Sequence, residues 1–142
     1  MAKNMDNLDA FLDKGNVIAI VGASRNKEKY GYKLFKALLN ANYDVYPVNP
    51  NAGEIDGHKC YPNLKSLPKK PDVVITVVPP KITDVIVDEV IDLGIKRVWM
   101  QPGSESSKAI EKCKKNGIDV IAKMCFVVDG LKENLDELAF KF

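Results

Sequence analysis

Short apolar runs alternate with stretches of helical periodicity along this chain. The apolar runs are rich in valine and isoleucine, and they do not alternate strictly with polar residues. That pattern is typical of strands buried on both faces of a parallel sheet. Five strands are therefore predicted, over residues 17–21, 44–48, 73–78, 97–100 and 118–122.

Between these runs, apolar residues recur at the spacing of an amphipathic helix. The first such stretch carries them at Leu34, Phe35, Leu38 and Leu39. Helices are predicted over residues 30–40, 83–93, 104–116 and 131–138. The stretch 49–71 has four prolines and two glycines, so we expect it to be mostly loop, with one short helical turn near Leu64.

Alternating strands and helices predict an α/β fold: a Rossmann-like, doubly wound sheet of five parallel strands flanked by helices. We expect one domain over residues 1–142 and, from right-handed crossovers, the strand order 3-2-1-4-5. Ligands of such sheets bind beyond the carboxyl ends of the strands, here near a switch point expected between strands one and four.

The end of the first strand has the outline of a phosphate site. Gly22, Ala23 and Ser24 form a small-residue turn between the strand and the first helix. Free N–H groups in the turn and the positive end of the helix dipole would both face one spot. Arg25 and Lys29 add cationic side chains, and arginine can pair with phosphate through two hydrogen bonds. A nucleotide-like ligand is therefore predicted.

The residues argue against a dinucleotide or a P-loop site. The dinucleotide fingerprint is G-x-G-x-x-G with an acid at the end of the second strand, whereas this turn has the single glycine Gly22. The second strand ends in Val48-Asn49-Pro50, without an acid, and no G-x-x-x-x-G-K-[ST] is present. A redox regulator that binds NAD(H) stays open as the least favoured alternative.

Four segments together resemble a known family. They are Ile20-Val21-Gly22-Ala23-Ser24, Val45-Tyr46-Pro47-Val48-Asn49-Pro50-Asn51, Val77-Val78-Pro79-Pro80 and Val98-Trp99-Met100-Gln101-Pro102-Gly103. In this order, at successive strand ends, they are similar to the small stand-alone coenzyme A-binding proteins. The same Rossmann-like domain forms the N-terminal part of the succinyl-CoA synthetase alpha subunit and of NDP-forming acyl-CoA synthetases.

The resemblance implies a role for each matching position. The turn residues Gly22, Ala23, Ser24 and Arg25 would hold the phosphates of coenzyme A. Asn49 and Pro50 would line the adenosine end. The segment Val78, Pro79 and Pro80 would form a wall against the adenine or the pantetheine arm, although two prolines can also simply end a strand. Gln101, with Pro102 and Gly103, would lie near the thiol end.

The sequence offers no evident catalytic or metal-binding set. The single histidine, His58, lies in the proline-rich loop, and no Ser–His–Asp set or C-x-x-C pair is present. Cys125 follows the fifth strand, where it could form a mixed disulfide with coenzyme A or be a buried small hydrophobe, the reading we favour. We therefore expect coenzyme A or acyl-CoA binding without catalysis. The alternative is the coenzyme A-binding subunit of a multi-chain acyl-CoA synthetase.

Composition and net charge limit the kinds of partner that we expect for this chain. The 142 residues are 46% hydrophobic and 28% charged with a net charge of +2, which gives no reason to expect a nucleic acid or membrane partner. No apolar run reaches the roughly 18 residues needed to span a bilayer, so we expect a cytoplasmic protein. A homodimer or a synthetase partner subunit stays open.

Overall fold

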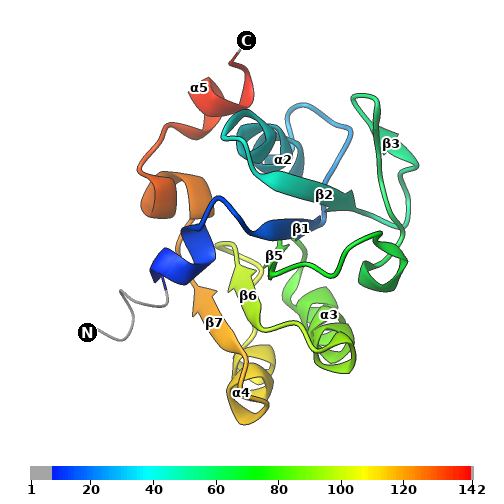
Figure 1. Ribbon diagram of the computed structural model, residues 1–142, viewed down its shortest axis with the longest axis vertical. Coiled ribbons are helices and arrows are strands. Elements are labelled where there is room, and N and C mark those ends of the chain that lie inside the picture. Colours follow the sequence, from blue (N-terminus) through cyan, green and yellow to red (C-terminus); the bar gives the residue numbers. More distant parts are fainter. Residues whose placement is uncertain (1–7, 142) are drawn as a thin grey trace.

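A computed structural model describes residues 8–141, and its centre is a five-stranded parallel sheet (Figure 1). The strands are β1 (Val17–Val21), β2 (Asp44–Val48), β5 (Val73–Thr76), β6 (Arg97–Met100) and β7 (Asp119–Ala122), in the spatial order β2-β1-β5-β6-β7. In the register, Ile20 of β1 lies opposite Pro47 of β2 on one side and Ile75 of β5 on the other. The predicted Rossmann-like α/β class is confirmed.

The predicted strand order, 3-2-1-4-5, is wrong. Numbered along the chain, the five strands run 2-1-3-4-5, so β2 lies at an edge and β5 takes the free side of β1. Pro47 gives a physical reason, because a proline cannot donate to a sheet ladder and is confined to edge strands or bulges. The predicted order would have given β2 a neighbour on both sides.

Helices cover both faces of the sheet. One face carries α2 (Tyr30–Asn40) and α5 (Leu135–Ala139), and the other carries α3 (Pro80–Leu93) and α4 (Ser107–Lys115) (Figure 1). Successive residues of β1 serve opposite faces: Ile18 and Ile20 join the core under α2, while Ala19 and Val21 join the core under α3 and α4. All four are buried, as the unbroken apolar run predicts.

Several predicted boundaries shift for local reasons. Strand β5 ends at Thr76 instead of residue 78. Helix α3 begins at Pro80, earlier than predicted, since proline at the first helical position is pre-set for the helix. Helix α4 begins at Ser107, because the side chain of Ser106 accepts a hydrogen bond from Ala109 N and caps it.

The single helix predicted over 131–138 is wrong. The chain instead forms a π-helical turn, η2 (Phe126–Leu131), and then the short helix α5. Lys132, at φ +61°, ends the first element in the left-handed region. Asn134 caps the second by accepting a hydrogen bond from Glu137 N. Upstream, residues 8–12 are helical.

The stretch 49–71 contains more regular structure than predicted. The helical turn expected near Leu64 is present as the 3₁₀ turn η1 (Leu64–Ser66). Before it, β3 (Glu54–Ile55) and β4 (His58–Lys59) form an antiparallel hairpin that the prediction missed. Its two-residue turn, Asp56-Gly57, has φ +50° and +81°, and Asp-Gly is a strong hairpin signal.

Tyr61 extends the sheet beyond β2. Its N–H donates to Pro47 O at 3.0 Å, and its carbonyl accepts from Asn49 N at 2.8 Å. The backbone of Tyr61 thereby covers the outer edge of β2 just where that strand ends.

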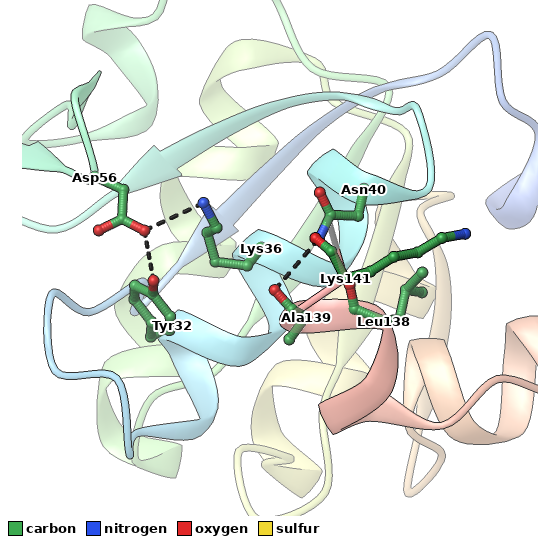
Figure 2. Close-up of polar contacts among 7 residues, drawn as sticks. All are labelled: Tyr32, Lys36, Asn40, Asp56, Leu138, Ala139 and Lys141. Atoms are coloured by element: carbon green, nitrogen blue, oxygen red, sulfur yellow. Dashed lines mark hydrogen bonds and ion pairs between the residues drawn. The ribbon is translucent and has the colours of Figure 1, made fainter.

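Two polar anchors attach outlying segments to α2 (Figure 2). Asp56 of the hairpin turn accepts a hydrogen bond from Tyr32 Oη and pairs with Lys36 Nζ at 3.1 Å. Burial and this hydrogen bond raise the pKa of Tyr32 to about 12, while the Tyr32 and Lys36 contacts lower the pKa of Asp56. At the other end of α2, Asn40 Nδ2 donates to Leu138 O at 2.7 Å.

The described helices are all too short or too polar to cross a bilayer.

Candidate functional site

The site is built around the close contact between the ends of β1 and β5. Gly22 has φ +104°, and a Cβ placed on it would lie 2.2 Å from the carbonyl oxygen of Val77. Glycine is therefore required for both its conformation and its size. The winding of the chain reverses between β1 and β5, so the switch point lies there and not between strands one and four as predicted.

A second glycine, Gly31, completes this contact and was missed from the sequence. A Cβ on Gly31 would lie 2.2 Å from Gly22 O, so the first turn of α2 can reach the end of β1 only without a side chain there. The dinucleotide fingerprint G-x-G-x-x-G ends five residues after its first glycine, whereas Gly31 lies nine residues after Gly22 and falls outside that spacing. A glycine in the first turn of an amphipathic helix, where it costs helix stability, was the available signal.

Short polar turns fold the loop between β1 and α2. Ser24 Oγ accepts a hydrogen bond from Asn26 N at 3.0 Å, and Asn26 Oδ1 accepts one from Glu28 N at 2.9 Å. Lys29 is the N-cap of α2, and no described side chain caps it. Arg25 and Lys29 are exposed, so cationic groups flank a helix N-terminus whose first N–H groups lack a side-chain partner.

An apolar pocket of about 310 Å³ opens beside Gly22, between the ends of β1 and β2 and helix α3. It is lined by Val21, Gly22, Val48, Asn49, Pro50, Asn51, Pro62, Asn63, Val78, Ile82, Ile86 and Glu89. Aliphatic and proline side chains make up most of the lining, which suits a flat apolar group better than a phosphate.

A polar pocket of about 560 Å³ adjoins it, lined by Ser24, Arg25, Asn26, Asn49, Asn51 and Ala52. The two pockets share Asn49 and Asn51. The side chain of Asn49 joins the two loops, because its Nδ2 donates to Ala23 O and its Oδ1 accepts from Asn51 N, both at 2.8 Å. Asn49 thus positions the loops that form both pockets.

The structure brings together most of the residues predicted for the site. Gly22, Asn49, Pro50 and Val78 line the apolar pocket, and Ser24, Arg25 and again Asn49 line the polar pocket. Ala23 is fully buried under the loop. Three other predicted residues, Lys29, Pro79 and Pro80, are exposed near the site without lining either pocket. Pro79 and Pro80 are the N-cap and first residue of α3, so they begin a helix as well as end a strand.

Gln101 lies apart from both pockets, fully buried after β6. Its Oε1 accepts a hydrogen bond from Phe126 N at 2.8 Å, which fixes the amide so that Nε2 donates to Tyr30 Oη. Tyr30 Oη in turn donates to Cys125 Sγ at 2.7 Å. Burial and the contact with Cys125 raise the pKa of Tyr30. Cys125 is only 6% exposed, so it is nearly enclosed by this network.

The remaining chemistry-bearing residues are not grouped. Within residues 8–141, no three His, Cys, Asp or Glu side chains are placed to hold a metal ion. His58 is exposed in β4, with its ring 5.5 Å from that of Phe35 in an edge-on contact. The geometry therefore describes a binding site for an extended ligand with an apolar and an anionic part.

Comparison with known proteins agrees with this description. The family model described as CoA binding domain matches residues 16–130. A solved conserved hypothetical protein from Pyrococcus furiosus is 43% identical, with a TM-score of 0.75, and the match covers 78% of this chain and 96% of that one. A solved hypothetical protein from Pyrococcus horikoshii is 35% identical, with a TM-score of 0.84 and 89% coverage of both chains.

Larger enzymes contain a similar region. The alpha subunit of an ADP-forming acetate–CoA ligase (ligase II) from Pyrococcus furiosus is 32% identical over 140 residues, which is 91% of this chain and 30% of that subunit. The chain spans only 17–30% of the length of the first four curated relatives, all ADP-forming acetate–CoA ligases or their subunits.

Proposed function

Since the chain belongs to the coenzyme A-binding domain family, we propose that it binds coenzyme A or an acyl-CoA at the site around Gly22. The observation that supports this most directly is the junction of the two pockets at Asn49. An apolar pocket next to a cationic loop at a helix N-terminus complements a nucleotide, whose base is flat and whose diphosphate is anionic.

The ligand would lie across the ends of the strands. Its adenine enters the apolar pocket against Val78 and Pro50, and its diphosphate lies over the turn at Gly22 and Ala23. Ser24 Oγ, Arg25 and Lys29 supply hydrogen bonds and positive charge there, in addition to the backbone N–H groups of the turn. The pantetheine arm would pass Pro79 and Pro80.

The thiol end would run toward Gln101 and Cys125. The Gln101 side chain has both amide groups committed to Phe126 and Tyr30, so its role would be to hold the loops at this end in place. No step of chemistry is assigned to these residues, and we propose binding without catalysis by this chain.

Thermal unfolding with added ligands tests the proposal. Coenzyme A at a hundred times its Kd should stabilise the chain by about 2.7 kcal/mol, while NAD should not. Arg25→Ala should weaken coenzyme A binding by about tenfold, through loss of a charge-assisted phosphate contact. Lys108→Ala removes the same charge from an exposed position on α4, away from the pockets, and should leave the affinity unchanged. Stabilisation by NAD but not by coenzyme A would overturn the proposal and favour the redox regulator.

A second candidate function is the coenzyme A-binding subunit of a multi-chain acyl-CoA synthetase. It is favoured by the ligase relatives, in which a similar region makes up less than a third of the polypeptide. A partner that co-purifies in fixed ratio and gives coenzyme A ligation only together with this chain would support it. If the chain is isolated from a cell extract without any other polypeptide, and light scattering shows a monomer or homodimer, that result counts against this function.

A further inference from the structure

Beyond the ligand class, we propose that Glu89 and Asn63 select the base, so that the apolar pocket accepts adenine and rejects hypoxanthine or guanine. This inference rests on the proposed function, because it assumes that a nucleotide base enters this pocket. It assigns specificity to two residues that no sequence motif pointed to.

The pocket walls supply surface without discriminating between bases. Val48, Pro62 and Val78 are apolar, and Ile82 at the start of α3 is 45% exposed, one of few large hydrophobic side chains left so open. A flat ring in the pocket would cover this exposed surface, which favours binding of any purine by burial of apolar area. Selection among purines has to come from the polar side chains in the lining.

Glu89 supplies a fixed hydrogen-bond acceptor. It lies on α3, half-buried, and its Oε2 accepts a hydrogen bond from Lys65 N at 3.1 Å. That bond ties the carboxylate to η1 and leaves Oε1 as the atom available to a ligand. An ionised carboxylate only accepts hydrogen bonds, so a base that contacts Glu89 has to present an N–H donor.

Asn63 supplies the complementary donor. Its Oδ1 accepts a hydrogen bond from Ser66 N at 2.9 Å as the cap of η1, which fixes the orientation of the amide. The group with which Asn63 can contact a ligand is therefore Nδ2, a donor. Glu89 and Asn63 are linked through η1, whose first and last residues, Leu64 and Ser66, flank the residue that bonds Glu89.

The other polar side chains of the pocket are less suited to reading a base. Both polar atoms of Asn49 are already used, by Ala23 O and Asn51 N. Asn51 is exposed and also lines the polar pocket, so it lies toward the sugar and phosphates. An acceptor from Glu89 next to a donor from Asn63 matches the adenine edge, where the exocyclic amino group lies beside a ring nitrogen. Hypoxanthine and guanine carry a carbonyl oxygen at that position, which the carboxylate repels.

Calorimetric titration with coenzyme A and with its analogue carrying hypoxanthine in place of adenine tests this. The unaltered protein should prefer coenzyme A by about tenfold or more, since the analogue leaves a buried acceptor unpaired. In Glu89→Gln the preference should fall to about threefold or less, because the new amide can keep the Lys65 bond and also donate to the carbonyl. Asp92→Asn, which removes the same charge from an exposed position one turn further along α3, should keep the full preference.

Asn63→Asp gives an independent check. The carboxylate keeps the cap on Ser66 N but replaces the Nδ2 donor with an acceptor, so coenzyme A affinity should fall by about tenfold. Equal binding of both ligands by the unaltered protein, or an undiminished preference in Glu89→Gln, would overturn the inference while leaving coenzyme A binding in place. If neither ligand binds, the proposed function itself fails.

Discussion

Gly31→Ala separates two opposite expectations about the start of α2. From helix propensity alone, replacing a glycine in a helix by alanine should stabilise the protein by about 1 kcal/mol. The structure predicts the opposite, because the new Cβ would lie 2.2 Å from the carbonyl oxygen of Gly22. The two backbones would have to separate by about 1 Å or more before that contact becomes ordinary.

The size of the destabilisation depends on whether the groups that the new Cβ meets can move away. Overpacking in a well-packed site costs about 1–3 kcal/mol, and the upper end applies where the obstacle is backbone and not a flexible side chain. After the gain in helix propensity is subtracted, the free energy of unfolding should fall by about 2 kcal/mol. The unfolding entropy of a 142-residue chain is roughly 0.3 kcal/mol per kelvin. The melting temperature should therefore drop by about 7 °C.

Calorimetry or circular dichroism of the two proteins measures this shift directly. Gly53→Ala is the matched control, since a Cβ there meets nothing within 4 Å and the backbone is not in the left-handed region. It should change the free energy of unfolding by less than about 1 kcal/mol. A melting temperature for Gly31→Ala that rises by about 3 °C, as propensity alone requires, would refute the close contact between α2 and β1.

Two further predictions concern the anchors and the buried hydroxyls. Because the pKa of Asp56 is lowered in the folded state, its contribution to stability is present above the ordinary carboxyl pKa of about 4 and is lost as the pH falls through the folded value. Melting temperatures between pH 7 and pH 2 should therefore fall less in Asp56→Asn than in the unaltered protein. Ser104 is 2% exposed and lies 2.9 Å from the Thr76 hydroxyl, so Ser104→Ala should cost about 1–3 kcal/mol in chemical denaturation, whereas Ser107→Ala on the exposed side of α4 should cost little. Equal acid sensitivity of Asp56→Asn and the unaltered protein would contradict the first prediction. Equal denaturation midpoints of Ser104→Ala and Ser107→Ala would contradict the second.

Much of the fold was predictable because the central strands β1, β5 and β6 bury both faces. A run such as Ile18-Ala19-Ile20 has no polar face to offer water, so its position and its place inside a parallel sheet follow from composition. The order of the strands did not follow, because the usual crossover rules permit both arrangements. Pro47 was the residue that distinguished them, through the donor it lacks.

Short elements were harder to predict from the sequence because they contain too few residues to show a hydrophobic pattern. Strands β3 and β4 are two residues each, below the length at which alternation can be recognised. The Asp56-Gly57 dipeptide indicated the hairpin more clearly than the strands did. Within 131–138, the left-handed Lys132 interrupts a sequence that otherwise reads as one helix.

Residues of the candidate site could be predicted where they directly follow a strand. They could not be predicted where tertiary packing brings them to the pocket from other parts of the chain. Gly22 and Asn49 follow strands directly, so the topology brings them together. Glu89 lies on helix α3 and Asn63 lies in the loop before η1. Both line the apolar pocket, yet nothing near them in the sequence indicates a pocket. Gln101 also follows a strand, yet its side chain turns inward to Phe126 N, a partner 25 residues away.

The segment that borders the apolar pocket also protects the sheet. Tyr61 occupies the backbone groups at the carboxyl end of the open side of β2, which would otherwise offer a template for strand addition by another molecule. The two residues that follow Tyr61, Pro62 and Asn63, line the apolar pocket. Changes to the pocket lining in this segment are thus coupled to exposure of the sheet edge. Variants that loosen it should be screened for self-association at high protein concentration before any change in affinity is interpreted.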